Sequence, residues 1–72
     1  MTDLSIYALP HDLDTAVRVM FTVDAEERVH VYGVFRIADD VEIDYAAMTL
    51  DDREQVEERC RYEFQQYMKE QQ

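Results

Sequence analysis

Apolar residues alternate with polar ones along two stretches in the first half of the chain. Ala16–Val23 reads AVRVMFTV and Arg28–Ile37 reads RVHVYGVFRI. A period of two with many β-branched residues predicts strands. The polar segment between them, Asp24–Glu27, has the length of a hairpin connector, so we expect the two strands to pair antiparallel.

Two further segments are expected to extend this sheet. Val41–Tyr45 reads VEIDY, in which apolar residues alternate with acids, and this predicts a strand after a tight turn. Asp3–Leu9 favours a short strand at an edge, because Pro10 follows it. Within Arg28–Ile37 the alternation places Gly33 among the inward-facing residues, where it marks a bulge or leaves room for a large neighbour.

The second half of the chain has a helical pattern. Thr49 is followed three residues later by Asp52, which is typical of a helix N-cap, and acids are favoured in a first helical turn. The apolar residues that follow recur at helical spacing and are Val56, Cys60, Phe64, Tyr67 and Met68. We therefore expect a helix over Leu50–Met68.

An amphipathic helix and a sheet that is apolar on one face bury these surfaces against each other. The sequence thus predicts an α+β fold over residues 1–72 as a single domain. Its three- or four-stranded antiparallel meander precedes one C-terminal helix, in the order β-β-β-α or β-β-β-β-α.

Size and composition limit the chemistry that we expect. The chain has 72 residues and a single cysteine, Cys60, so it forms no disulfide within itself. One cysteine and two histidines do not supply a closed zinc site, and no sequence motif indicates another metal or a cofactor. Cys60 lies on the apolar stripe, which predicts a buried, unreactive thiol. We expect no catalytic activity.

The charge balance restricts the partners. The chain carries 17 acids against 7 bases, a net charge of −10. Phosphates and anionic lipids repel such a surface, so direct nucleic-acid or membrane binding is disfavoured, whereas a basic protein partner is favoured. The N-terminal segment has no basic, apolar leader pattern and no stretch is long enough to span a membrane, which favours a cytoplasmic location.

Acids are concentrated in the predicted strand near the middle of the chain. Asp40, Glu42 and Asp44 alternate along it, and Asp39 adds a charge at the turn. On a strand these carboxylates would lie on one face at steps of roughly 6.8 Å, comparable with neighbouring phosphates. Such a row is expected to occupy a basic groove that otherwise holds nucleic acid. The alternative is that the acids protect an edge and keep the protein soluble.

Two other surfaces are candidates for contact. Glu54 and Glu58 form a second acidic patch on the predicted helix. The sheet face opposite the helix carries Met20, Tyr32 and Val34 among polar residues, and contiguous apolar residues of this kind mark interfaces. A homodimer through this face or through a strand edge would also stabilise a core that is small for a chain of this length.

Two functions follow as hypotheses. The first is an inhibitory or regulatory binding module that docks on a basic, nucleic-acid-binding protein or complex. In size, acidity and lack of a cofactor motif the chain resembles, in type only, phage-encoded inhibitors such as those that block CRISPR complexes. The alternative is a homodimeric structural or assembly protein whose acidity serves solubility.

Overall fold

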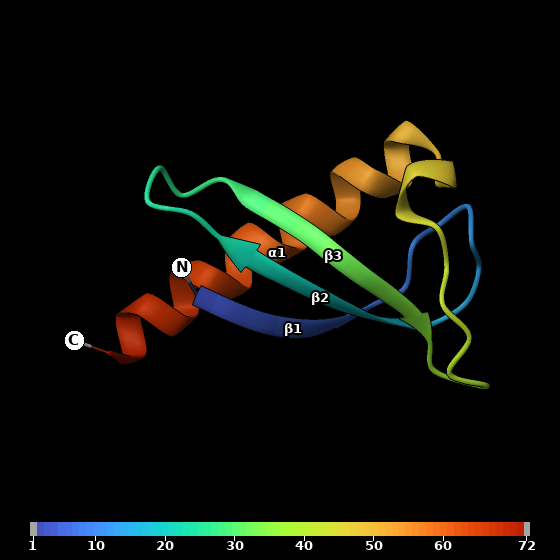
Figure 1. Ribbon diagram of the computed structural model, residues 1–72, viewed down its shortest axis with the longest axis horizontal. Helices are drawn as coiled ribbons and strands as arrows, with labels where there is room; N and C mark the ends of the chain where they lie inside the picture. The colour runs from blue at the N-terminus through green and yellow to red at the C-terminus, as the bar shows by residue number, and fades with distance from the viewer. Residues whose placement is uncertain (1, 72) are drawn as a thin grey trace.

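The computed structural model describes residues 2–71, which form a three-stranded antiparallel sheet with one long helix packed on one face (Figure 1). The strands are β1 (Thr2–Ala8), β2 (Val17–Val23) and β3 (Val29–Arg36), in the spatial order β1-β2-β3. A short 3-10 helix, η1 (Tyr45–Ala47), precedes the helix α1 (Leu50–Glu70). The predicted α+β fold of order β-β-β-α is confirmed.

The core lies between the sheet and α1. Alternate residues of the central strand β2 are buried, which is the pattern that a one-sided sheet requires. The helix contributes the predicted apolar stripe at Val56, Cys60 and Phe64, whereas Met68, also expected in it, is exposed. The buried hydrophobic residues are Ile6, Val17, Val19, Phe21, Val23, Val34, Met48, Val56, Cys60 and Phe64.

The strand predicted over Val41–Tyr45 is wrong. This segment runs beside β3 with only one bridge, between Glu42 and Phe35, and two backbone hydrogen bonds flank that bridge. The chain then turns into η1, because the Asp44 carboxylate accepts a hydrogen bond from the backbone N–H of Ala46 and caps that helix. The third strand of the meander is instead the N-terminal segment, β1.

The prediction that Val34 faces away from the helix is also wrong. Met20 pairs with Gly33 and Phe21 pairs with Val31, so Tyr32 is an extra residue in β3 and forms a bulge. A bulge shifts the alternation of side chains by one residue. Val34 therefore turns into the core, where it is buried.

The bulge also turns Phe35 outward, onto the face that α1 does not cover. The ring of Phe35 lies over Gly33, and a Cβ atom at Gly33 would come within 2.9 Å of that ring. Gly33 adjoins a bulge and leaves room for a large neighbour, as expected, but its predicted inward position is wrong, because it pairs with Met20 on the face that α1 does not cover.

The helix begins as predicted and extends two residues beyond the predicted end. Thr49 is the N-cap, and its Oγ1 accepts a hydrogen bond of 3.2 Å from the backbone N–H of Asp52. In a capping box the acid three residues on would bond back to the N-cap backbone. Asp52 instead points into the protein and is only 1% exposed.

The Asp52 carboxylate holds the β1–β2 loop against the start of α1. Its two oxygens accept hydrogen bonds from the backbone N–H groups of Asp12, at 3.0 Å, and Leu13, at 3.1 Å. Burying a carboxylate is costly unless hydrogen bonds compensate it, and these two bonds do so. The position near the helix N-terminus adds a favourable dipole interaction.

Two further helix residues fasten the same loop. The Thr49 hydroxyl donates to the Asp12 carboxylate at 2.6 Å. The Gln55 side chain accepts from the backbone N–H of His11 at 3.3 Å and donates to the carbonyl of Leu9 at 3.4 Å. The first two turns of α1 thus fix the loop that leads from β1 to β2.

Replacing Asp52 with alanine should reduce the free energy of unfolding by about 2–4 kcal/mol, because two loop N–H groups lose their acceptors. Urea denaturation followed by circular dichroism measures this loss. The matched control is Asp51→Ala, which removes an exposed first-turn acid and should change stability by less than about 1 kcal/mol. Equal losses in the two variants would contradict this role for Asp52.

Candidate functional site

One end of the molecule gathers acids from three separate segments. The loop before β2 and the turn after β3 lie together, since the backbone N–H of Ile37 donates to the carbonyl of Ala16 at 3.1 Å. Figure 1 shows the start of α1 at the same end, on the right. We call this region the acidic end; its exposed acids are Asp12, Asp14, Asp39, Asp40, Glu42, Asp44, Asp51 and Glu54.

Three of these eight acids have structural partners. Asp12 accepts from Thr49, and its pKa is lowered mainly by that hydrogen bond and further by His11. Asp39 forms an ion pair of 2.9 Å with Arg36, and Asp44 caps η1. Within residues 2–71 the carboxylates of the other five make no hydrogen bond or ion pair, so they remain open to a partner.

The acidic end differs from the row that the sequence predicts. Asp40 has a left-handed backbone, with φ of 57°, and Asp44 turns back toward η1. A row of carboxylates at strand spacing is therefore not formed. The structure adds Asp12, Asp14 and Asp51 to the predicted residues. The positions of Asp12 and Asp14 follow from the meander once Asp3–Leu9 is accepted as a strand, because alternate loops then emerge at the same end, whereas Asp51 is placed by the first turn of α1.

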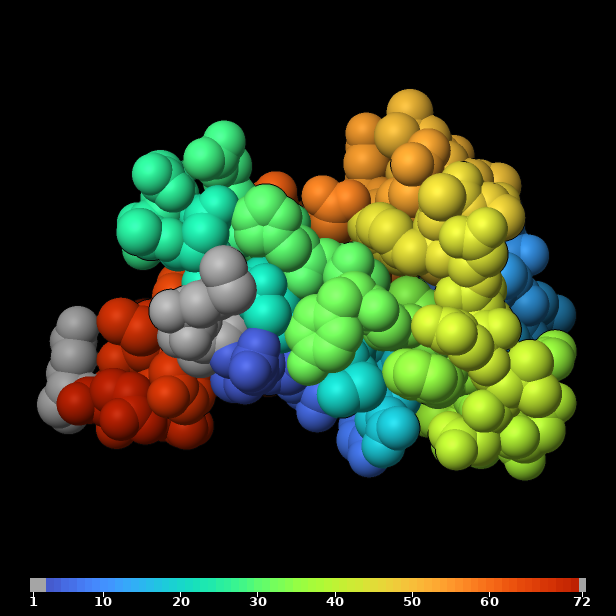
Figure 2. Space-filling view, in the orientation of Figure 1, coloured from blue at the N-terminus to red at the C-terminus, as the bar shows by residue number. Residues whose placement is uncertain are grey.

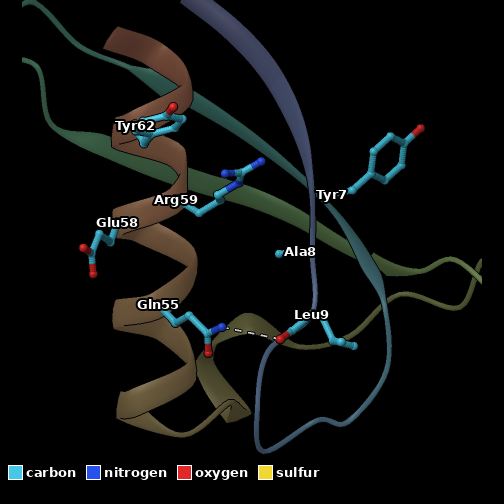
Figure 3. A pocket seen from close by; sticks show the side chains of 7 residues that line it. All are labelled: Tyr7, Ala8, Leu9, Gln55, Glu58, Arg59 and Tyr62. Carbon is cyan, nitrogen blue, oxygen red and sulfur yellow. Dashed lines mark hydrogen bonds between the residues drawn. The ribbon is translucent and has the colours of Figure 1, made fainter. Parts of the chain in front are cut away.

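The second predicted patch is divided. Glu54 lies in the first turn of α1 and belongs to the acidic end. Glu58 lies one turn further along the helix, is exposed, and points away from β1 (Figure 3). The two side chains share the outer side of α1, as their spacing of four residues requires.

The sheet face that α1 leaves uncovered, here called the open face, is partly apolar. In Figure 2 the viewer looks onto this face, with β3 across its middle. Met20 is half-buried and Tyr32 is 54% exposed, so two of the three residues predicted here are present. Phe35 takes the place of Val34, and the Arg18 guanidinium lies 5.6 Å from the centre of its ring, a cation–π contact.

A second acidic cluster lies at the opposite end, in the β2–β3 hairpin. Asp24 accepts hydrogen bonds from the backbone N–H groups of Glu26 and Arg28, each at 2.9 Å. His30 Nε2 lies 2.8 Å from its carboxylate, and because an ionised carboxylate only accepts, the ring is the donor. Hydrogen bonding to His30 is the largest cause that lowers the pKa of Asp24 to about 2. The Asp24 carboxylate is thus engaged in hydrogen bonds within the hairpin.

The interior holds two titratable groups beside Glu57. The Tyr45 hydroxyl donates to the Glu57 carboxylate at 2.6 Å, and burial together with this bond raises the pKa of Tyr45. Burial, reinforced by the charge of Glu57, raises the pKa of the Cys60 thiol to about 12. Cys60 is fully buried, which confirms the position that the sequence predicts for it.

Neither a metal cluster nor a membrane span emerges from the part of the chain that the structure describes. Residues 2–71 bring no three histidine, cysteine, aspartate or glutamate side chains into a group that could hold a metal ion. Among the same residues, no helix combines the length and the apolar composition that crossing a bilayer requires.

Titration of Asp24 should have a midpoint near pH 2, below the usual 3.8, when its carboxyl carbon is followed by NMR. Because the folded-state pKa is depressed, Asp24 contributes stability above pH 3.8 and loses it as the pH falls toward 2. Asp24→Asn should make stability less dependent on pH in this window. A midpoint at 3.8 would contradict the hydrogen bonding described here.

Cys60 should not react with a thiol reagent such as DTNB while the protein is folded at neutral pH, because the thiolate is the reactive form. Reaction should follow at once in denaturing urea. Gln65→Cys, on the exposed side of α1, is the control and should react in the folded state. Rapid labelling of the folded wild-type chain would show that Cys60 is accessible.

Comparisons of this chain with models of protein families, with curated proteins and with solved structures found no match. A function for the chain therefore has to be argued from its own surfaces. Three are available: the acidic end, the open face of the sheet, and the exposed edge of β1 beside the helix.

Proposed function

We propose that this chain is a binding module that docks through its acidic end on a basic surface of a nucleic-acid-binding protein or complex. The observation that carries this proposal is the convergence of eight exposed acids, from three segments, beside three arginines of the described residues, Arg18, Arg36 and Arg53. A surface dominated by one sign of charge attracts a partner of the opposite sign and steers its approach.

The open carboxylates supply the contacts. Lysine and arginine side chains that normally hold phosphates donate charge-assisted hydrogen bonds to carboxylates equally well. Asp40, Glu42 and Glu54 are exposed and have no partner within residues 2–71, so binding disrupts no internal bond. The module then acts by occupying a groove and excluding nucleic acid, without chemistry of its own. A phage-encoded inhibitor of a CRISPR complex would act in this way.

The acidic end supports competition for a groove rather than close mimicry of a nucleic-acid strand. Its carboxylates come from loops and a helix terminus and are spread over an end of a molecule whose extents are 35 × 22 × 18 Å. A competitor needs enough charge to cover part of a basic groove. Regular phosphate spacing is not needed for that.

The test uses tagged protein to capture partners from a bacterial lysate at low and at high salt. Captured proteins are identified by mass spectrometry, and the affinity of a purified candidate is then measured. We expect capture of a nucleic-acid-binding protein that is lost at high salt, because salt screens exposed charges over about 8–10 Å. DNA or RNA should compete with the module for that partner.

Two neutralised variants with equal charge locate the binding surface. The first removes three unpartnered charges of the acidic end and consists of Asp40→Asn, Glu42→Gln and Glu54→Gln. The second removes three charges from the opposite end and consists of Glu26→Gln, Glu27→Gln and Glu70→Gln.

The first variant should bind the purified partner roughly tenfold more weakly than the second, since each exposed pair contributes about 0.2–1 kcal/mol. Asparagine at position 40 keeps the tolerance for the left-handed backbone. Equal binding by the two variants, both folded by circular dichroism, would remove the acidic end from the interaction.

A further inference from the structure

The strand β1 has an unprotected outer edge. It is the first strand in the sheet order, and within residues 2–71 no segment pairs with its far side. Its pairing with β2 runs without a break from Thr2↔Val23 to Ala8↔Val17. Soluble proteins usually blunt such edges with lysine, proline, bulges or a covering segment. β1 has none of these devices and a single charged residue, Asp3.

The other edge of the sheet is protected. The backbone N–H of Arg36 donates to the carbonyl of Val41 at 2.9 Å, and that of Ile43 donates to the carbonyl of Val34 at 2.8 Å. The remaining part of β3 carries the bulge at Tyr32. The contrast between the two edges indicates that β1 is the one available for adding a strand.

A groove lies beside the C-terminal end of β1, at Tyr7, Ala8 and the following residue Leu9. It has a volume of about 490 Å³ and lies between β1 and the near side of α1 (Figure 3). Tyr7 and Leu9 are 70% and 62% exposed beside it, and Tyr62 of the helix is 51% exposed. Arg59 extends from the helix toward β1 in Figure 3. These apolar surfaces would lose contact with water if a strand lay along β1.

The side of α1 that faces the edge of β1 carries three acids. Glu58 lines the groove, although its side chain points away from β1 in Figure 3, and Glu63 and Glu70 lie further along the edge, beside Leu4 and Ser5. Gln55, Arg59, Tyr62 and Gln66 follow one another at helical spacing and form one stripe. The neighbouring Glu63 is neutralised by an ion pair of 3.0 Å with Arg59. In a chain with a net charge of −10, the strand β1 itself carries one acid, Asp3, so a second acidic copy meets less repulsion at this edge than at the acidic end.

We propose that the occupant is a second copy of this chain, whose β1 pairs antiparallel with β1 of the first about a two-fold axis at Ser5. This register places Leu4 opposite Ile6 of the second copy, on the face that α1 covers. It places Asp3 opposite Tyr7 of the second copy, so that the only carboxylate of the strand meets a hydroxyl donor. The strand is therefore complementary to itself, as a two-fold interface requires.

The charge distribution selects this arrangement. β1 runs toward the acidic end of its own molecule, so antiparallel pairing sends the two acidic ends in opposite directions (Figure 1). Parallel association would bring these ends together, where their like charges repel. The product is a six-stranded sheet with both helices on one face and an acidic end at each extremity. This inference does not depend on the proposed function of the acidic end.

The oligomeric state of the purified chain tests the proposal. Light scattering after size exclusion, from low to high micromolar concentration, should show a dimer of the 8.6 kDa chain. Added salt should strengthen this dimer, because it screens the repulsion between two acidic copies. Binding through the acidic end should respond to salt in the opposite sense, which separates failure of one proposal from failure of the other. A monomer at every concentration would overturn the dimer.

Two substitutions with equal charge change test the interface. Ser5→Lys sets two lysines directly opposite each other at the axis and should weaken dimerisation roughly tenfold, since like charges in cross-strand pairs destabilise a sheet. Gln65→Lys, on the exposed outer side of α1, should leave it intact. Circular dichroism verifies that both variants fold. A wild-type dimer that Ser5→Lys does not weaken would assign association to another surface.

A disulfide tests the register. Opposed residues on antiparallel strands have Cα atoms about 4.5–5.5 Å apart, within the span of about 4.4–6.8 Å that a disulfide bridges. Ser5→Cys should therefore form a covalent dimer under mild oxidation, whereas Gln65→Cys should not. Cys60 is buried and does not interfere. Failure of Ser5→Cys to cross-link a dimer that persists would overturn the axis at Ser5.

Discussion

The carboxylate of Asp52 joins the start of α1 to the β1–β2 loop, whose nearer bonded residue is 39 positions away. Without this carboxylate, two backbone N–H groups of the loop would lack partners, and the start of the helix would lose two of the bonds that hold it to the loop. The same contact brings the acids of the loop beside those of the first helical turn. Their mutual repulsion is offset by the positive end of the helix dipole and by the hydrogen bonds that Asp12 and Asp52 accept.

The elements that the sequence predicts correctly are those with a local physical signal. Two such signals can be recognised from a single continuous segment. One is the alternation of apolar and polar residues in β2 and most of β3, and the other is the apolar helical stripe after the Thr49 cap. The fold class follows, because these elements can hide their apolar sides only against each other. The thiol of Cys60 is placed correctly for the same reason.

The predictions that fail are those in which a contact between segments distant in the sequence determines the local structure. The bulge at Tyr32 comes from how β3 meets β2, and the alternation of β3 alone gives no sign of it, except at Gly33. Val41–Tyr45 has the pattern of a strand, but capping of η1 by Asp44 ends its pairing early. The acidic end was only partly predictable, since its membership depends on which loops share an end. The inward turn of Asp52 had no sequence signal beyond the cap.

Strand addition to this sheet is limited to one side. The segment beside the end of β3 occupies backbone groups that another chain would need, and the bulge interrupts the remainder of that edge. A copy that pairs through β1 therefore presents no second edge to a third copy. Polymerisation into fibrils requires a free edge at both sides of each unit, and the irregular path of residues 41–43 removes one of them. Residues 41–43, which do not form a regular strand, thereby protect this edge of the sheet from polymerisation.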